Sequence, residues 1–252
     1  EPARRKDLIT PEHVDGGDGL LLEEYRDSFD NRCQRGLSPA GLTHIRLDAI
    51  IADDGSHDDQ DHSAREAPVF DLPPDVLRFV QPSRYCESDL LSNFAWSQFG
   101  GVKPGWERVQ AIVDFTHRQI TFGYPYADVF RTATGALNQR VGVCRDYAHL
   151  AVALCRAMNI PARYCNGYMG DIGVPADPAP MDFNAWFEAY LDGKWYTFDA
   201  RHNQPRIGRI VICRGLDAAD CAMIQTFGPH TLNAFKVVTE EVTFGAPVAM
   251  VA

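Results

Sequence analysis

The sequence predicts an α+β protein in which helices pack on an antiparallel sheet, preceded by a small β-rich N-terminal domain. Apolar residues have period two in the first 70 residues, helical period from about residue 72 to 160, and period two again afterwards. Helices and strands in separate runs favour an antiparallel sheet. We therefore expect two domains, residues 1–70 and 71–252. An apolar content of 45% with 23% charged residues suits a packed core.

The N-terminal domain is predicted from alternating segments. Residues 44–51, HIRLDAII, alternate apolar and polar side chains as a half-buried strand does. Residues 20–29 and 31–37, separated by Asp30, are predicted as its hairpin neighbours. Residues 52–66 hold six acidic side chains and one basic one, which favours a solvated loop over a metal site that uses His57 or His62.

Four segments have the helical period: residues 88–101, 104–120, 132–139 and 144–161. Ser88 is the expected N-cap of the first, and Gly100 its stop. Pro104 is a typical entry residue for the second. The last is apolar nearly all round, which predicts a buried helix.

Five later segments are rich in aromatic and β-branched residues: 162–170, 183–191, 194–200, 209–214 and 232–242. Asp192-Gly193 predicts a two-residue type I′ turn that pairs Leu191 with Lys194. In that register Trp186 faces Asp199, and Asn184 faces Arg201. Side chains at Asn184, Trp186, Glu188, Thr197, Asp199 and Arg201 then share one side of the sheet. Asn184 and Asp199 become diagonal neighbours, roughly 7–8 Å apart at Cα.

Cys144 is the cysteine whose surroundings suggest chemistry. Gly142-Val143-Cys144 leads directly into the buried helix, where free backbone N–H groups and the helix dipole favour a thiolate. The backbone N–H of Cys144 is also a candidate oxyanion donor. Without a second signal, a cysteine at a helix start is more often structural, and Cys155 and Cys165 are interpreted as structural.

GVCRDYAHLAVALCRAMNIPARY, followed by DFNAWFEAYLDGKWYTFDA, resembles the bacterial transglutaminase-like superfamily over about residues 105 to 213. The resemblance implies a papain-like core with a Cys-His-Asp triad on a helix start and two adjacent strands. It also implies a small N-terminal β domain. By this resemblance Cys144 matches the nucleophile and Asp199 the orienting acid, while Asn184 stands where the family has its histidine.

Asparagine cannot accept the thiol proton, so three interpretations stay open. In the first, His202 supplies the base after a bend beyond the strand end; His149, about 140° around the helix from Cys144, is expected to be structural. In the second, Cys144 works as a thiolate held by the helix terminus and Arg145, with Asn184 and Asp199 positioning substrate. In the third, the protein is a pseudoenzyme that binds a peptide or amide.

Residues 171–182, rich in proline and aspartate, are either one wall of a substrate cleft or a plain connection. Arg201, Arg206 and Arg209 either meet a substrate carboxylate or are solvated charges at a strand edge. Arg201 and Trp186 are the predicted substrate-binding residues, although Trp186 also fits a core position.

Composition excludes several classes. The net charge of −10 argues against a nucleic-acid partner. The sequence has neither an apolar run of 18 residues nor a secretory signal pattern, so we expect a cytoplasmic protein without membrane contact. Seven cysteines without metal-site or disulfide spacing fit a reducing compartment. No cofactor or metal is expected, since P-loop, dinucleotide, zinc-protease and calcium-loop motifs are missing. The sequence says nothing of oligomeric state.

The predicted function is thiol-dependent acyl chemistry on a peptide, protein or small amide substrate, by hydrolysis or amine transfer through a Cys144 thioester. The alternative is a non-catalytic binding module with the same fold.

Overall fold

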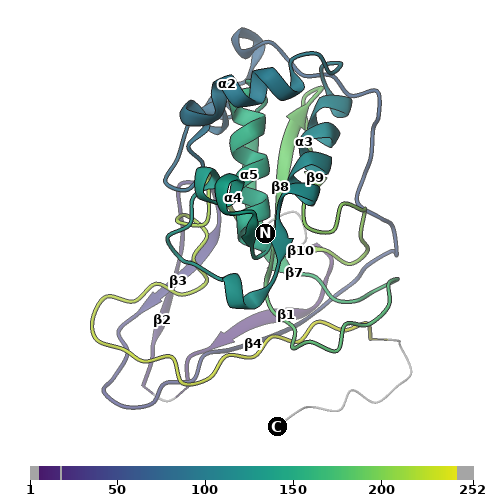
Figure 1. Ribbon diagram of the computed structural model, residues 1–252. Coiled ribbons are helices and arrows are strands. Elements are labelled where there is room, and N and C mark those ends of the chain that lie inside the picture. Colours follow the sequence, from purple (N-terminus) through teal and green to yellow (C-terminus); the bar gives the residue numbers. More distant parts are fainter. Residues whose placement is uncertain (1–5, 18, 243–252) are drawn as a thin grey trace.

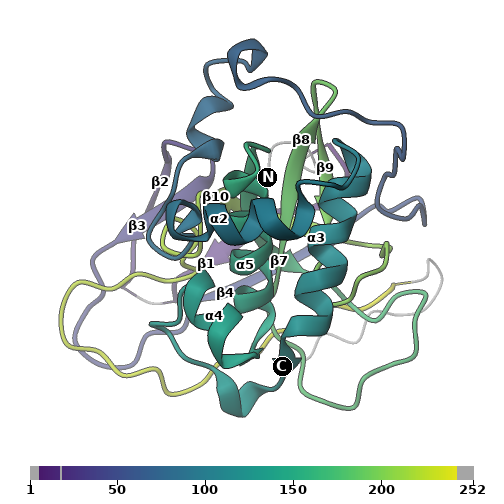
Figure 2. The same cartoon turned by 45° about the horizontal axis from the view of Figure 1, so that its top comes forward.

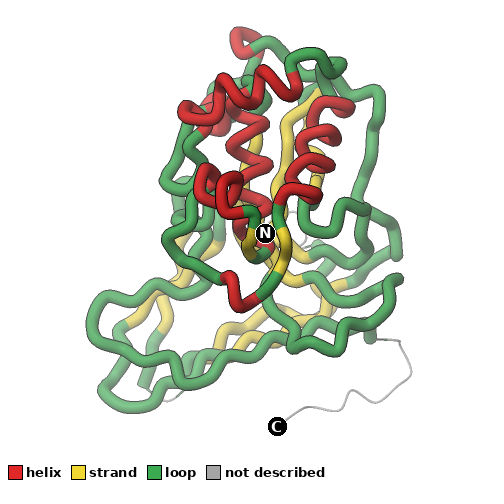
Figure 3. The backbone as a smooth tube through the Cα atoms, in the orientation of Figure 1, coloured by secondary structure: helices red, strands yellow, loops and turns green. Residues whose placement is uncertain are grey.

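The computed structural model describes residues 6–17 and 19–242, and its centre is a helical layer packed on a four-stranded antiparallel sheet (Figure 1). The strand order is β10 (Ile210–Gly215), β7 (Ala162–Tyr168), β8 (Asn184–Leu191) and β9 (Lys194–Phe198). This architecture confirms the predicted α+β class. In the tube view, helices occupy one half of the molecule and strands lie behind and below them (Figure 3).

The β8–β9 hairpin has the predicted register, with Leu191 opposite Lys194. Asp192 and Gly193 both have positive φ, as a type I′ turn requires. The pairing ends at Phe187 and Phe198. The predicted pairing of Trp186 with Asp199 is therefore not part of the ladder, because the chain leaves the sheet one residue earlier.

Helix α5 (Cys144–Ala157) lies at the centre of the fold, between the sheet and the other helices (Figure 2). It packs against β7 and β8 on one side and against α2 (Ser88–Phe99), α3 (Trp106–Gln119) and α4 (Ala133–Gln139) on the other. Every residue from 146 to 157 is buried, as the continuous apolar pattern predicted. Asn159, with φ of 64°, ends the helix in the left-handed region.

The starts of the other helices differ slightly from prediction. Ser88 is the first residue of α2 rather than its N-cap, which is Glu87. Leu90, expected on the apolar face, is 67% exposed. Gly105 precedes α3 with φ of 102°, and a Cβ there would come within 2.4 Å of the Ala64 carbonyl oxygen. Glycine is thus required where the segment before the helical layer packs against the start of α3.

The N-terminal part forms two separate strand pairs. β2 (Leu22–Arg26) and β3 (Arg32–Gly36) form the predicted hairpin. β4 (Arg46–Ile51) pairs instead with β1 (Leu8–Asp15), so its predicted place beside that hairpin is wrong. β1 was not predicted because Pro11 interrupts its pattern, and the ladder is irregular between Thr10 and His13.

Short elements complete the described chain. β5 (Thr121–Phe122) and β6 (Val141–Gly142) form a parallel pair that leads directly into α5. Three 3-10 helices cover Val69–Asp71, Leu77–Val80 and Tyr124–Tyr126. Residues 232–242, predicted as a last strand, form no strand. The backbone N–H of Thr239 there meets the Met181 sulfur, 3.3 Å away, rather than a sheet edge.

Candidate active site

Cys144 is the first residue of α5, as predicted. The turn before it is fixed by Asp146, whose Oδ2 accepts the Val143 N–H at 2.8 Å. Asp146 is 1% exposed and pairs with Arg131 at 3.1 Å. A Cβ on Gly142 would lie 2.6 Å from Asp146 Oδ2. The Gly-Val-Cys motif thus allows a buried carboxylate to cap the helix that presents the thiol.

The Cys144 thiol lies beside the start of β8, and Cys144 is partly accessible to solvent. Its Sγ donates weakly to the Phe183 carbonyl oxygen at 3.9 Å. Burial of the sulfur raises the pKa of the Cys144 thiol, and the Arg201 charge and the Ala185 N–H oppose this rise. The carboxylates of Asp182 and Asp199 add to it. The direction of the pKa shift is therefore opposite to the expected preference for a thiolate, because burial and two carboxylates outweigh Arg201 and the Ala185 N–H.

Arg201 is the cation near the thiol, and not Arg145 as expected. The Arg145 guanidinium donates to the Asp128 carbonyl oxygen and lies over the Tyr85 ring, 5.5 Å from its centroid. Arg201 lies over the Phe122 ring at 3.7 Å and donates from Nη1 to Asn184 Oδ1 at 3.1 Å. The predicted facing of positions 184 and 201 thus holds for the side chains, although the ladder ends before them.

Asp199 is buried and saturated with hydrogen bonds. Its Oδ1 accepts the backbone N–H groups of Arg201 and His202, each at 3.0 Å. Its Oδ2 accepts from His202 Nδ1 at 3.0 Å and from Nη1 and Nη2 of Arg209 at 3.2 Å. Burial alone would raise the pKa of Asp199, but the His202 hydrogen bond and the Arg209 charge hold it below its usual value. Asp199 is therefore an ionised carboxylate that orients the His202 ring through a hydrogen bond.

His202 reaches Asp199 because the chain turns immediately after β9. The N–H of Asn203 donates to the Asp199 carbonyl oxygen at 2.8 Å, which closes a single turn over residues 199–203. The bend considered from the sequence is therefore present. Among the described residues, the His202 ring hydrogen-bonds to Asp199 and makes no hydrogen bond to Cys144 Sγ.

His149 has the structural role expected of it. It is fully buried, its ring stacks on Tyr85 at 5.1 Å, and its Nε2 accepts the Ala218 N–H at 3.1 Å. Burial lowers the pKa of His149 to about 3, so the ring stays neutral. An imidazole that accepts a backbone N–H and is enclosed in the core cannot serve Cys144.

Most of the acidic segment, residues 52–66, is exposed, as expected of a solvated loop, but Asp58 and Glu66 are half-buried against the core. Asp58 accepts from Arg209 Nε at 3.1 Å and from Nη2 at 3.0 Å. Asp59 pairs with Lys194, and Glu66 with Arg108. Arg206 and Arg209 are 4% and 7% exposed, so they are internal rather than solvated strand-edge charges.

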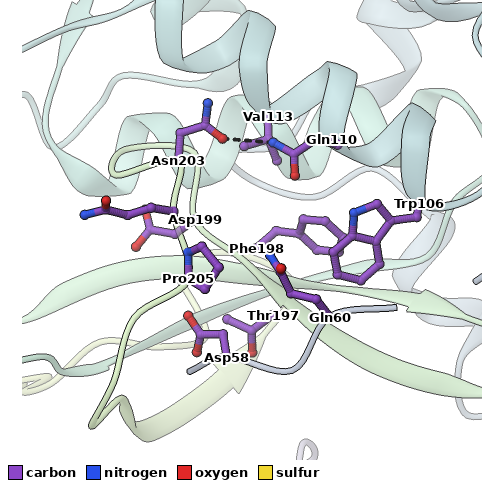
Figure 4. Close-up of a pocket in the computed structure, with 11 residues that line it drawn as sticks. Asp58, Gln60, Trp106, Gln110, Val113, Thr197, Phe198, Asp199, Asn203 and Pro205 are labelled. Atoms are coloured by element: carbon purple, nitrogen blue, oxygen red, sulfur yellow. Dashed lines mark hydrogen bonds between the residues drawn. The ribbon is translucent and has the colours of Figure 1, made fainter. Parts of the chain in front are cut away.

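A hollow of about 200 Å³ lies where this segment meets the end of β9 (Figure 4). Asp58 and Asp199 both line it, and a hydrogen bond of 2.9 Å from Gln110 to Asn203 closes one side. Trp186 lies outside the reach of a substrate, because it is completely buried with the Arg209 guanidinium 4.5 Å from its ring centroid. Its expected substrate contact is therefore excluded by burial.

Comparison with known proteins agrees with this geometry. A family model of the transglutaminase-like superfamily core matches residues 93–200. The crystal structure of a "putative cysteine protease" from Cytophaga hutchinsonii is 32% identical, with a TM-score of 0.72 over 88% of this chain and 75% of that one. The chain belongs to the transglutaminase-like superfamily. Cys144, the first residue of α5, and Asp199, directly after β9, both lie within the matched residues.

An uncharacterized protein of Mycobacterium leprae is 36% identical over 73 residues. That match covers 28% of this chain and 26% of the relative, so it concerns a fragment of each. No helix among residues 6–17 and 19–242 is long and apolar enough to cross a membrane. In the same residues, no group of three His, Cys, Asp or Glu side chains could hold a metal ion.

Sequence reasoning missed Arg209, which contacts Asp199, and Asp58, which contacts Arg209. Arg209 was interpreted as either a substrate contact or a solvated strand-edge charge, and Asp58 as part of a solvated loop. Arg209 lies 10 residues from Asp199 along the chain, whereas it lies 151 residues from Asp58. The closely spaced arginines after Asp199 were a usable signal, since a buried carboxylate needs a cationic partner.

Proposed function

We propose that Cys144 carries out thiol-dependent acyl chemistry on an amide, with His202 as the general base that Asp199 holds. The observation that carries this proposal is the 3.0 Å hydrogen bond between His202 Nδ1 and Asp199 Oδ2. Since Asp199 is ionised and can only accept, Nδ1 must carry the proton. The lone pair of a neutral His202 ring then lies on Nε2, as a general base requires.

A base is needed because the raised pKa of Cys144 keeps its sulfur protonated at neutral pH. In the proposed reaction His202 Nε2 takes the thiol proton while Sγ attacks the substrate carbonyl carbon. The C–N bond then breaks, and the leaving amine takes the proton from His202, which leaves a thioester on Cys144. Water or an amine then attacks the thioester carbonyl carbon while His202 accepts its proton. The C–S bond breaks to release the product, and His202 returns the proton to the Cys144 sulfur. Because the described residues show no hydrogen bond between Nε2 and Sγ, the proposal requires these two atoms to approach each other when substrate binds.

Arg201 and Asn184 are proposed as the polar groups of the site. The Arg201 charge favours the thiolate over the thiol, and its hydrogen bond to Asn184 holds it there. The backbone N–H of Cys144, in the first turn of α5, is the proposed oxyanion donor. Asn184 thus orients a permanent charge at the position where the family has its base.

We further propose a peptide, protein or small amide as substrate and a reducing compartment such as the cytoplasm. All seven cysteines are free thiols, which supports the second point. Hydrolysis is preferred to amine transfer, since no amine-acceptor site is identified.

The rival proposal is a non-catalytic binding module. It is favoured by the raised pKa of Cys144 and by the lack, among the described residues, of a hydrogen bond from an imidazole to its sulfur. The two proposals differ in whether Cys144 forms and then releases an acyl group.

The test uses p-nitrophenyl acetate as an acyl donor and intact-mass measurement of the protein. We expect an acyl group on Cys144 and continued release of nitrophenolate. Cys144→Ser should abolish turnover, and His202→Gln should slow it about 10²–10⁴-fold. Cys33→Ser, a change at the other partly accessible cysteine, is the control and should leave turnover intact. Turnover unaffected by Cys144→Ser would refute the proposal, and a folded protein that never acylates at Cys144 would favour the binding module.

A further inference from the structure

Asp58 is fixed against the core by both its backbone and its side chain. Its N–H donates to the Arg206 carbonyl oxygen at 2.9 Å, and its Oδ2 accepts the Arg206 N–H at 2.9 Å. The carboxylate also faces the guanidinium of Arg209 side by side, with contacts of 3.0–3.2 Å from Nε and Nη2. Such a two-pronged pair fixes the plane of the guanidinium as well as its position.

The adjacent edge of the same guanidinium, formed by Nη1 and Nη2, faces Asp199. Nη1 and Nη2 of Arg209 both lie 3.2 Å from Asp199 Oδ2, the oxygen that also receives His202 Nδ1. The Trp186 ring covers the guanidinium at 4.5 Å. The Arg209 side chain is only 5% exposed, so water cannot substitute for either carboxylate. A continuous chain of contacts therefore leads from Asp58 through Arg209 and Asp199 to His202.

The charges along this chain are unequal, because two carboxylates share one guanidinium. The remaining charged neighbour, Arg206, donates from Nη2 to the Gly170 carbonyl oxygen at 2.9 Å, and this Nη2 lies 3.9 Å from an Asp171 oxygen. Asp58 thus adds a second carboxylate to the guanidinium that holds Asp199, and it does so from a segment outside the α+β core.

We propose that Asp58 and Arg209 are positioning residues of the active site, and that they hold Asp199 and His202 in working geometry. Asp58, one carboxylate of the acidic segment, is then connected to the catalytic groups, through Arg209. This inference rests on the proposed function, because positioning matters only if His202 acts on Cys144. Asp58 touches no reacting atom in this scheme and acts entirely through Arg209.

The test compares Asp58→Asn with Asp59→Asn in the full chain. Asp59 is the matched control, because it lies in the same segment and pairs with an exposed lysine, Lys194, away from Asp199. Turnover of p-nitrophenyl acetate is measured against pH, together with the low-field proton resonance of the His202 Nδ1–H. Arg209→Lys is the second variant, since a lysine cannot form both two-pronged contacts at once.

We expect Asp58→Asn to lower turnover at neutral pH about tenfold, as a slight displacement of a catalytic group does. The shape of its pH–rate profile should change, and the Nδ1–H resonance should shift or broaden. Asp59→Asn should leave all three unchanged, and Arg209→Lys should resemble Asp58→Asn.

Equal pH profiles and equal Nδ1–H resonances in Asp58→Asn and Asp59→Asn would overturn the inference. That result is distinguishable from failure of the proposed function. If only the positioning inference fails, the wild-type chain turns over substrate and His202→Gln does so more slowly. If the proposed function fails, the wild-type chain itself does not turn over substrate through Cys144. The resonance reports on the Asp58 connection to His202 in either case.

Discussion

Asp199→Asn should destabilise the fold as well as the site. The change keeps an oxygen that can accept the two backbone N–H groups at Oδ1 but places an amide NH₂ against His202 and Arg209. Breaking a buried ion pair on one side costs about 3–5 kcal/mol. Because Asp58 still pairs with Arg209, we expect the lower end, about 3 kcal/mol. For a chain of this length the melting temperature should fall by about 6–12 °C.

The stability difference between wild type and Asp199→Asn should depend on pH, in a direction set by the pKa shift of Asp199. The folded pKa of Asp199 is below its unfolded value, so its contribution to stability is complete above the unfolded pKa of about 4. It is lost as pH falls from there toward the folded pKa. The difference in unfolding free energy between wild type and Asp199→Asn, measured by urea denaturation, should therefore be largest near pH 7 and shrink below about pH 4.

Glu188→Gln is the matched control for this effect. Glu188 is another buried carboxylate of the same sheet, and it binds Arg163 and Arg214. Its loss should also destabilise the protein, but without removing the orientation of His202. Both variants should melt early, and only Asp199→Asn should lose turnover of p-nitrophenyl acetate at a temperature where each is folded. A destabilisation below about 1 kcal/mol at pH 7 for Asp199→Asn would refute the reasoning from buried charge.

Two further predictions concern the groups around the sulfur. Arg201→Gln removes the charge that lowers the pKa of Cys144, so iodoacetamide labelling of Cys144 should require higher pH. Arg145→Gln, next to Cys144 in sequence but bound to the Asp128 carbonyl oxygen, should leave the labelling profile in place, and equal effects of the two changes would contradict the assignment. Asn184→His should not raise turnover, because the Asp199 oxygens are already occupied and cannot orient a second imidazole. If Asn184→His remained active when His202 was also replaced, this prediction would be contradicted.

Local sequence signals were sufficient for most of the fold. The I′ turn at Asp192-Gly193 set the register of β8 and β9, and the unbroken apolar pattern after Cys144 identified the buried helix. Both depend on interactions between near neighbours in the chain. The pairing of β1 with β4 and the lack of a strand over residues 232–242 depend on which sheet edges are available, and periodicity carries no such information.

Local sequence signals also placed some of the candidate site residues, but not those that depend on long-range packing. Cys144, Asp199 and His202 lie on elements whose ends could be read from the sequence. The cation near the sulfur was assigned to Arg145 by nearness in sequence, whereas the turn after β9 brings Arg201 there. Asp58 could not be found this way, because a run of carboxylates fits water as well as a buried guanidinium. Only the packed structure shows which carboxylate is matched to Arg209.

The role proposed for Asn184 depends on Arg201 and His202. In the triad that the superfamily resemblance implies, one imidazole accepts the thiol proton and, once protonated, stabilises the thiolate. An asparagine can do neither, but it can hold an arginine that supplies the positive charge permanently. The arginine cannot accept a proton, so acceptance must come from another group, and His202 on Asp199 has the required tautomer. Under the proposed function, charge and proton acceptance are divided between two adjacent residues, Arg201 and His202, and the hydrogen bonds from His202 to Asp199 are consistent with this division.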